Sequence, residues 1–484
     1  MLMKKYHLLA TLKTCLLIFS GVLLASCADT FDSNEQFDGG VRNQPLESPA
    51  EDDIIIEPST DGSKMTISWP VVFGAGGYEF KVFNASDEST PIINDTIDGC
   101  TRTINREDDI IYKICIRTLG NAKLNNTEAT TVNPKTYSTF TESYGKIPTN
   151  TDLFEYFENN PISDTVAIAT ELNFDLEPGG TYTLSQQLNF KYHKVVLRTT
   201  DKTNHASVTI ADQANFIVSN DFSLKYVDID ASATTKPIME AYNYTSEPPT
   251  DTIAKPKNYL MIDFVRIMGC NFKGVTGCLF YDNNKPWCVV NFLIQNTVIE
   301  MLTETSNIKN ESFISFQGGG IKDFKIEKST IYQKGAGNSK YFLRYNNSAR
   351  VDRMGYETSD HTSLTYLSNT FYKVASGQWA NYSGISNYSA YDLQNNIWYQ
   401  CADGNIARRM MGNGRLGNGC TFYSANNTYW HNDAQADQGN YDESTSQLTT
   451  DPAFVDPDNN IFTPTGAEQV EKKTGDPRWF NTAE

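Results

Sequence analysis

Features that would point to nucleic acid or metal chemistry are scarce in this 484-residue chain. Its 40 basic side chains are outnumbered by 58 acidic ones, which gives a formal net charge of −18. A phosphate backbone needs a basic footprint, so this balance argues against nucleic acid as a partner. Histidine occurs only five times and shows no metal-ligand spacing, so we predict no metal centre and no cofactor.

Cysteine adds little to this picture. Two cysteines, Cys15 and Cys27, lie close to the N-terminus, and no two of the others form a CxxC pair. The seven remaining cysteines are odd in number and lack paired spacing, so they predict neither a zinc ribbon nor a full disulfide framework. We expect most of these seven side chains to be small buried apolar groups. They are Cys100, Cys115, Cys270, Cys278, Cys288, Cys401 and Cys420.

The N-terminus has the features of a processing signal. Lys4 and Lys5 give it a basic start, and the apolar run Leu16–Ala25 is too short to span a membrane comfortably. The run ends in Leu-Ala-Ser-Cys at residues 24–27, which resembles a bacterial lipobox. The resemblance implies that residues 1–26 are a lipoprotein signal peptide and that the thiol of Cys27 accepts a diacylglycerol. Ordinary secretory cleavage near Ser26 is the alternative.

Acidic residues follow this cysteine closely, at Asp29, Asp32 and Glu35. Their placement resembles the surface-export signals of glycan-harvesting Gram-negative bacteria. It implies a protein of the outer membrane that is held by its lipid and faces the cell exterior. Residues 27–50 are polar and contain two prolines, so we interpret them as a tether between anchor and body.

Residues 51–145 contain short strands of alternating polarity. The segment Met65–Pro70 carries Trp69, a glycine-rich turn leads into a strand that opens on Tyr78, and Tyr112–Arg117 forms a later strand. This order resembles a fibronectin type III domain. The resemblance implies two sheets packed around Trp69 in a module that usually serves as a spacer.

One motif recurs from residue 260 onward: alternating apolar residues, a polar two-residue corner, and an apolar pair. The corners lie 26 to 40 residues apart, which is typical of solenoid repeats with loop insertions. Asparagine tolerates the left-handed backbone that a tight corner demands, and stacked amides can hydrogen-bond from rung to rung. We assign the corners to Cys270-Asn271, Asn296-Thr297, Ser329-Thr330, Asn369-Thr370, Asn395-Asn396 and Asn427-Thr428.

This motif resembles the pectate-lyase-like superfamily, whose second turn is a two-residue bend with stacked asparagines. Residues 451–457 and 475–479 resemble the last turn of such proteins. The resemblance implies an all-β chain, with a fibronectin type III-like β-sandwich followed by a right-handed parallel β-helix over residues 146–484. The layout also resembles surface lipoproteins linked to polysaccharide utilisation, often of pectins. A β-sandwich with coincidental asparagine turns is the alternative.

The start of the proposed β-helix also has a recognisable pattern. Residues Thr151–Asn159 place apolar side chains at helical spacing, with Thr151 as a candidate cap. A short amphipathic helix suits the open end of a β-helix, where it shields the core and the unpaired edge. We expect strands to follow at Thr165–Ile168, Thr181–Leu184, Val195–Arg198 and Phe222–Ile229.

Aligning the rungs by their corners predicts two outward-facing columns. The first holds Lys273, Ile299, Tyr332, Tyr372, Trp398 and Trp430. Sugar rings pack on aromatic faces, so Tyr332, Tyr372, Trp398 and Trp430 are candidate ligand-binding residues. Support of overlying loops is the alternative. The second column is more simply a solvated strand face, and it holds Arg266, Phe292, Lys325, Thr365, Tyr391 and Tyr423.

Positive charge gathers in one part of the chain. Residues 332–430 hold nine basic and five acidic side chains, a net charge of +4, which leaves −22 for the remainder. Guanidinium groups bind carboxylates with two hydrogen bonds, so these loops predict an anionic ligand such as a uronic-acid polymer. Pairing with local carboxylates is the alternative. The candidate arginines are Arg344, Arg350, Arg353, Arg408, Arg409 and Arg415.

Catalytic residues are not identifiable. The resembling lyases use an Arg or Lys base and calcium, and hydrolases need paired carboxylates, but no acidic column recurs on successive rungs. Asp456, Asp458 and Asn460 offer oxygen ligands for calcium, although their sequence is typical of a plain turn. We therefore favour a surface lipoprotein that binds polysaccharide beside outer-membrane glycan-uptake proteins, with acidic plant glycan such as pectin as the candidate ligand. The alternatives are a polysaccharide lyase or glycoside hydrolase, and a structural accessory of an uptake complex.

Overall fold

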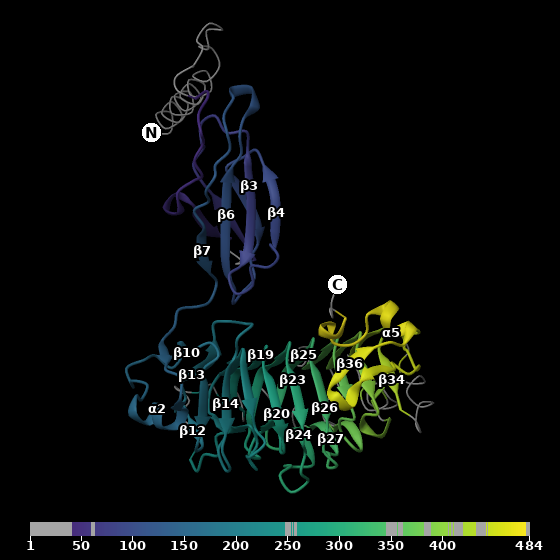
Figure 1. Cartoon of the computed structure of the whole chain (residues 1–484). Coiled ribbons are helices and arrows are strands. Elements are labelled where there is room, and N and C mark those ends of the chain that lie inside the picture. The colour runs from purple at the N-terminus through teal and green to yellow at the C-terminus, as the bar shows by residue number, and fades with distance from the viewer. Residues whose placement is uncertain are drawn as a thin grey trace, which may run out of the picture. The chain divides into compact units, whose positions relative to one another are not determined.

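The structure, a computed structural model, divides the chain into two compact units (Figure 1). The first unit ends at Thr139 and the second begins at Phe140, slightly before the boundary predicted between residues 145 and 146. Each unit has its own hydrophobic core. The residues that the structure describes are 41–59, 63–246, 253, 255, 259–344, 356, 362–381, 389–404, 406, 407, 410, 420–431, 442 and 444–480.

The first unit contains two antiparallel sheets. One has three strands in the order β1-β2-β5, namely Ile55–Pro58, Lys64–Ser68 and Thr101–Asn105. The other has four strands in the order β4-β3-β6-β7, namely Ile93–Ile97, Tyr78–Asn84, Ile111–Thr118 and Lys135–Ser138. The alternation of buried and half-buried residues along β6 shows that one face of the sheet lies inward. Short 3-10 helices lie at Glu51–Asp53 and Ala122–Leu124.

Trp69 lies at the centre of this unit, as the sequence predicts. Its ring stacks on Phe80 at 5.8 Å and meets Tyr78 edge-on at 5.4 Å. Side chains of both sheets share one core cluster with it. The described end of the predicted tether is part of this unit, because the backbone of Leu46 donates to Thr127 and Glu47 accepts from Thr118.

The second unit contains three long parallel sheets, which we call sheets 1, 2 and 3. Sheet 1 has ten strands: β8 (Gly145–Ile147), β10 (Glu171–Leu176), β13 (Lys194–Thr199), β16 (Phe222–Lys225), β19 (Leu260–Met268), β22 (Trp287–Gln295), β25 (Gly320–Glu327), β28 (Thr362–Leu367), β31 (Ser389–Gln394) and β33 (Thr421–Ala425). Sheet 2 also has ten: β9 (Thr151–Asp152), β11 (Thr181–Leu184), β14 (Ala206–Ile210), β17 (Val227–Asp230), β20 (Asn271–Val275), β23 (Val298–Met301), β26 (Thr330–Gln333), β29 (Thr370–Tyr372), β32 (Ile397–Tyr399) and β34 (Thr428–Trp430). Sheet 3 has seven: β12 (Leu188–Asn189), β15 (Phe216–Val218), β18 (Met239–Ala241), β21 (Phe280–Tyr281), β24 (Ser312–Ser315), β27 (Tyr341–Arg344) and β30 (Gln378–Asn381).

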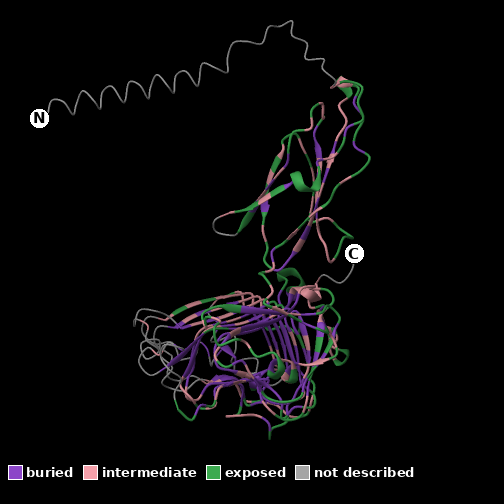
Figure 2. Cartoon of the chain, turned by 90° about the vertical axis from the view of Figure 1, so that its left-hand side faces the viewer, coloured by how far each residue is buried: buried purple, intermediate pink, exposed green. Residues whose placement is uncertain are grey.

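The chain visits these sheets in turn. Strand β10 of sheet 1 leads to β11 of sheet 2 and β12 of sheet 3, and β13 then pairs in parallel with β10 to begin the next rung. Every rung therefore adds strands to the same stacks, which is the arrangement of a parallel β-helix. Its strands are rich in buried residues, coloured purple in Figure 2, and these residues form one hydrophobic core cluster. The predicted strand at Thr165–Ile168 is wrong, because these residues form turns.

The corner between sheets 1 and 2 begins with a residue in the left-handed conformation. This residue is Gly269, Asn296, Lys328, Ser368, Asn395 or Asn426 on successive rungs, with φ between 48° and 62°. Tyr226 has the same conformation and divides the predicted strand Phe222–Ile229 into β16 and β17. Our assignment of the corners was therefore correct at Asn296-Thr297 and Asn395-Asn396 and one residue late at the other four.

The second corner residues form a buried column of hydrogen bonds. The backbone N–H of Ser329 donates to Asn369 Oδ1 at 3.0 Å, that of Asn369 to Asn396 Oδ1 at 3.1 Å, and that of Asn396 to Asn427 Oδ1 at 3.1 Å. Asn369 and Asn396 also donate through Nδ2 to the next amide oxygen, each at 2.9 Å. We call this the corner ladder, and it confirms the stacked amides that the motif predicts.

Both ends of the second unit carry other elements. The predicted helix is confirmed as α2 (Leu153–Asn159), capped by Asp152 instead of Thr151. Near the C-terminus lie the hairpin strands β35 (Phe454–Asp456) and β36 (Ile461–Pro464), helix α5 (Ala467–Lys472), and 3-10 helices at Ala402–Gly404, Pro457–Asn459 and Pro477–Trp479. The seven cysteines carry no disulfide, and four of them, in the second unit, are buried as expected.

The corner ladder predicts a large cost for removing one amide. Asn396→Ala leaves the Asn369 N–H and the Tyr366 carbonyl, which accepts from Asn396 Nδ2 at 2.7 Å, without these buried partners. Each unsatisfied buried group costs about 1–3 kcal/mol, so we expect the free energy of unfolding to fall by about 3 kcal/mol. Denaturant titration measures it, with the exposed Asn204→Ala as control. A change of equal size in both variants would contradict a special role for the ladder.

Candidate functional site

The predicted aromatic column lies on the outer face of sheet 2, with one member replaced. Tyr332 of β26 pairs in register with Tyr372 of β29, and the next partners are Tyr399 and Trp430. The rings of Tyr372 and Tyr399 stack at 5.0 Å with an interplanar angle of 15°. The column therefore consists of three tyrosines and Trp430.

Trp398 does not belong to this column, so its predicted outward orientation is wrong. Its side chain is 1% exposed and lies in the interior of the β-helix. There it stacks between Phe371 at 5.6 Å and Tyr429 at 5.3 Å. Trp398 is therefore part of the hydrophobic core and has no open face for a ligand.

The error follows from the corner assignment. The predicted corner begins at the left-handed residue on the rungs of Asn296 and Asn395, but at the residue after it on the other four rungs. On these two rungs each predicted outward position therefore lies one residue too early in the sequence. The same shift explains why Ile299, Phe292 and Tyr391 are predicted to face outward although they are buried. A shift of one residue moves a side chain to the opposite face of a strand.

The C-terminal segment, residues 448–480, covers most of the aromatic column. The ring centre of Phe462 in β36 lies 5.0 Å from that of Tyr332 and 5.2 Å from that of Tyr372. The ring centres of Phe454 and Tyr399 lie 5.4 Å apart. Tyr332 and Tyr372 are each 6% exposed. These two rings support an overlying segment, as our alternative had it, and offer no open platform.

Polar contacts fix the same segment to sheet 2. Asp476 Oδ2 accepts a hydrogen bond from Thr330 Oγ1 at 2.8 Å, and its N–H donates to Thr370 Oγ1 at 3.0 Å. Burial raises the pKa of the Asp476 carboxyl, and the neighbouring Arg478 opposes this rise. Gly475 precedes it with φ +105°, where a Cβ would lie 2.9 Å from Thr370 Oγ1, so this close approach requires glycine.

Of the predicted arginines, only Arg344 lies within the described residues. Its Nη1 donates to the Asn310 carbonyl at 2.8 Å and lies 3.4 Å from a Glu311 carboxylate oxygen. Its guanidinium also lies 5.6 Å from the centre of the Tyr341 ring. Local partners therefore hold Arg344. Arg350, Arg353, Arg408, Arg409 and Arg415 lie outside the described residues, so the predicted cationic cluster stays a prediction.

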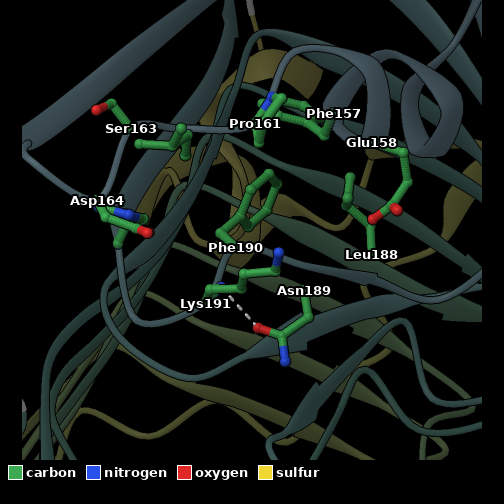
Figure 3. A pocket seen from close by; sticks show the side chains of 11 residues that line it. Phe157, Glu158, Pro161, Ser163, Asp164, Leu188, Asn189, Phe190 and Lys191 are labelled. Carbon is green, nitrogen blue, oxygen red and sulfur yellow. Dashed lines mark hydrogen bonds between the residues drawn. The ribbon is translucent and has the colours of Figure 1, made fainter.

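A cavity of about 270 Å³ lies at the first rung of the β-helix (Figure 3). Helix α2 and the residues after it form one side, and β12 with the corner after it forms the other. Apolar rings and polar groups of several kinds meet in this space. Its lining residues are Phe157, Glu158, Pro161, Ile162, Ser163, Asp164, Leu188, Asn189, Phe190, Lys191 and His193.

Local sequence explains how the cavity is built. Asp152 caps α2 by accepting from the Glu155 N–H at 3.0 Å, and this helix places Phe157 5.0 Å from Phe190. On the opposite side, Lys191 has a positive φ of 51°, and its N–H donates to Asn189 Oδ1 at 2.9 Å. The two walls meet where the rings of Phe157 and Phe190 pack together, and these rings form the floor of the cavity.

His193 is the most enclosed polar side chain of the cavity. It is 7% exposed, and its Nδ1 has no hydrogen-bond partner among the described residues. Burial lowers its pKa below the ordinary value of 6.5, and the nearby Asp164 opposes this effect. The imidazole is therefore neutral at neutral pH, with one nitrogen that donates and one that accepts.

The arrangement suits binding better than metal chemistry. Glu158, Asp164 and Lys191 are exposed at the rim, whereas Phe157, Leu188 and Phe190 are buried. Within the part of the chain that the structure describes, no three His, Cys, Asp or Glu side chains gather as metal ligands. The candidate calcium ligands form a turn in which Asn459 Nδ2 donates to Asp456 at 2.8 Å.

Sequence reasoning found the helix but missed the cavity beside it. We interpreted α2 only as a cover for the open end of the β-helix. The available signal was Asn-Phe-Lys-Tyr-His at residues 189–193, a run of polar and aromatic residues at the first corner after β12. Its meaning depends on contact with α2, which lies about 30 residues earlier in the chain.

The covered column predicts a structural role for Tyr372. Removing this ring in Tyr372→Ala takes away contacts with Tyr399, Phe454 and Phe462, so we expect the free energy of unfolding to fall by about 3 kcal/mol. Denaturant titration checks this loss, with Tyr423→Ala as the control because that side chain is 57% exposed. Unchanged stability of the Tyr372 variant would mean that the segment does not rest on this ring.

The buried His193 predicts a dependence of stability on pH. Because its pKa is lowered in the folded state, its contribution is complete above about pH 6.5 and is lost as the pH falls toward the lowered pKa. We expect the free energy of unfolding to drop less between about pH 7.5 and pH 5.5 in His193→Gln than in the wild type. His205→Gln is the control variant, since both ring nitrogens of His205 have partners. Equal drops in wild type and His193→Gln would refute the prediction.

Three family models, all domains of unknown function, match the chain in succession. They are DUF4992 over residues 3–179, DUF4957 over 180–334 and DUF5123 over 364–479. The first ends between β10 and β11, inside the second unit. No curated protein and no solved structure matches the chain. Among the described residues, no helix is both long and apolar enough to cross a membrane.

Proposed function

We propose that this protein is a lipid-anchored cell-surface protein that binds polysaccharide and holds a sugar residue in the cavity beside α2. The observation that carries this proposal is the pairing of a buried aromatic floor with an unpartnered His193 Nδ1 and a polar rim. Pockets that bind small molecules combine apolar walls with a few placed polar groups in this way.

The chemistry of a sugar fits these walls. The C–H groups of a pyranose ring form apolar faces that pack on aromatic rings, here those of Phe157 and Phe190. Its hydroxyls both donate and accept hydrogen bonds, and a neutral imidazole offers one of each. A buried polar group without a partner costs free energy, so a hydroxyl bonded to His193 stabilises the complex.

The N-terminal sequence supports the proposed location. The lipobox-like residues 24–27 supply Cys27 for a lipid anchor to the outer membrane, and the acidic residues after it favour export to the cell surface. A protein placed there meets glycans before they cross the membrane. Its partners would be polysaccharide and outer-membrane glycan-uptake proteins, and no cofactor is needed.

The strand arrangement supports the finer fold assignment. The orders β1-β2-β5 and β4-β3-β6-β7 around Trp69 fit a fibronectin type III-like sandwich. Two-residue corners with stacked amides fit a right-handed, pectate-lyase-like β-helix. A preference for acidic glycans such as pectin rests on the arginine-rich loops, mostly outside the described residues.

A polysaccharide lyase or glycoside hydrolase is the second candidate. Glu158 and Asp164 both line the cavity, and glycoside hydrolysis needs two carboxyl groups facing one sugar. Newly formed reducing ends or unsaturated uronates after incubation with glycans would favour this enzyme. A structural accessory of an uptake complex would neither bind nor cleave glycans.

A glycan panel tests the binding proposal directly. We expect the full chain in detergent to be retarded by at least one glycan in affinity electrophoresis, and His193→Phe to weaken this retention about tenfold because it removes one hydrogen bond. Asp212→Ala is the control, since that exposed carboxylate lies outside the cavity. Equal retention of His193→Phe and wild type would refute binding in the cavity.

A further inference from the structure

We infer that the cavity receives the terminal, uncharged sugar residue of a glycan chain, so that the protein recognises chain ends and not internal stretches. This inference rests on the proposed function and adds to it the part of the ligand and its charge. Four observations support it: where the lining residues lie, how the floor is closed, which charges surround the space, and how deep His193 lies.

The lining residues are confined to one rung and its cap. They belong to residues 157–164 and 188–193, and none comes from β15 (Phe216–Val218), which pairs with β12 on the next rung. A glycan lying along the solenoid would need contacts on successive rungs, which follow each other at about 4.8 Å. The cavity has no such continuation, so it offers space for one end of a chain.

The floor of the cavity is closed by apolar side chains. Phe157, Leu188 and Phe190 are buried and belong to the same core cluster. The volume of about 270 Å³ lies just below the usual range of ligand pockets, about 300–1,000 Å³, which suits a single small unit. An internal sugar of a glycan chain is linked to a neighbour on both sides, whereas a terminal sugar is linked to only one. That single neighbour can extend out of the cavity through the open rim.

The charges around the cavity disfavour an acidic sugar. The charged residues of its lining are Glu158, Asp164 and Lys191, so two carboxylates face one ammonium group when His193 is neutral. A uronate would add a further negative charge beside them. Like charges in a partly enclosed site repel, so an uncharged hexose or pentose is favoured there.

The depth of His193 also fits a terminal sugar that enters the cavity while the rest of the glycan chain points outward. The side chain is buried while Ser163, Asp164 and Lys191 are exposed, so the unpartnered Nδ1 lies deeper than the rim. Because Nδ1 is itself enclosed, a hydroxyl of the terminal residue bonds to it only after the imidazole turns toward the cavity, and the remaining chain then stays outside. The other sugars then stay in water, and they add little to the affinity.

Titration calorimetry on the full chain in detergent tests this inference. The probes are neutral cello-, galacto- and xylo-oligosaccharides of two to six units, the long polymers, and oligogalacturonides of the same lengths. For the neutral sugar that binds, we expect the affinity per glycan chain to change less than about threefold with the length of the glycan. We also expect one protein molecule to bind per glycan end. Affinity and the number of proteins per chain that rise steadily with length would overturn end recognition.

Charge is tested with Asp164→Asn, whose side chain is exposed and similar in size. We expect this variant to improve binding of oligogalacturonides relative to neutral oligosaccharides by several-fold, while Asp212→Asn leaves the ratio unchanged. Tighter binding of oligogalacturonides than of every neutral probe by the wild type, if His193→Phe abolishes it, would place the acidic sugar in the cavity and overturn the uncharged ligand. No binding of any probe would instead refute the proposed function, so the two failures are distinguishable.

Discussion

The corner between sheets 1 and 2 is the constraint on which the second unit depends. A left-handed residue bends the chain, and the next side chain is buried beside its equivalent on the following rung. Because a buried amide without partners is costly, the corners must superpose, and superposed corners fix the register of both flanking strands. The inner stack of Phe371, Trp398 and Tyr429 and the outer column of tyrosines both follow from this register.

Much of the architecture was predictable because it depends on local pattern. Alternation of polarity locates most strands, helical spacing locates α2, and recurring asparagines indicate stacked corners. The errors were single-residue shifts. Asparagine favours the left-handed position at Asn395 but occupies the buried position at Asn369, so composition alone does not say which member of the corner it is.

The candidate site was harder to predict because it depends on contacts far apart in sequence. Tyr332 meets Phe462, and Thr330 binds Asp476, across more than a hundred residues. No periodicity in the sequence links these partners. The sequence therefore does not show that residues 448–480 cover the aromatic column, which by itself resembles an open platform for a sugar. The cavity likewise arises where α2 approaches β12, and only the folded chain brings Phe157 to Phe190.

Residues 454–479 follow the rungs that they cover, and this order has a consequence for folding. Parallel rungs pair with their nearest neighbours, so they can stack progressively in the order of the sequence. Residues 454–479 follow all ten strands of sheet 2 in the sequence, and until they fold back, Tyr332 and Tyr372 form an exposed apolar strip on the solenoid. Molecules in which residues 454–479 have not docked would expose this strip to one another, so this docking protects the protein against aggregation.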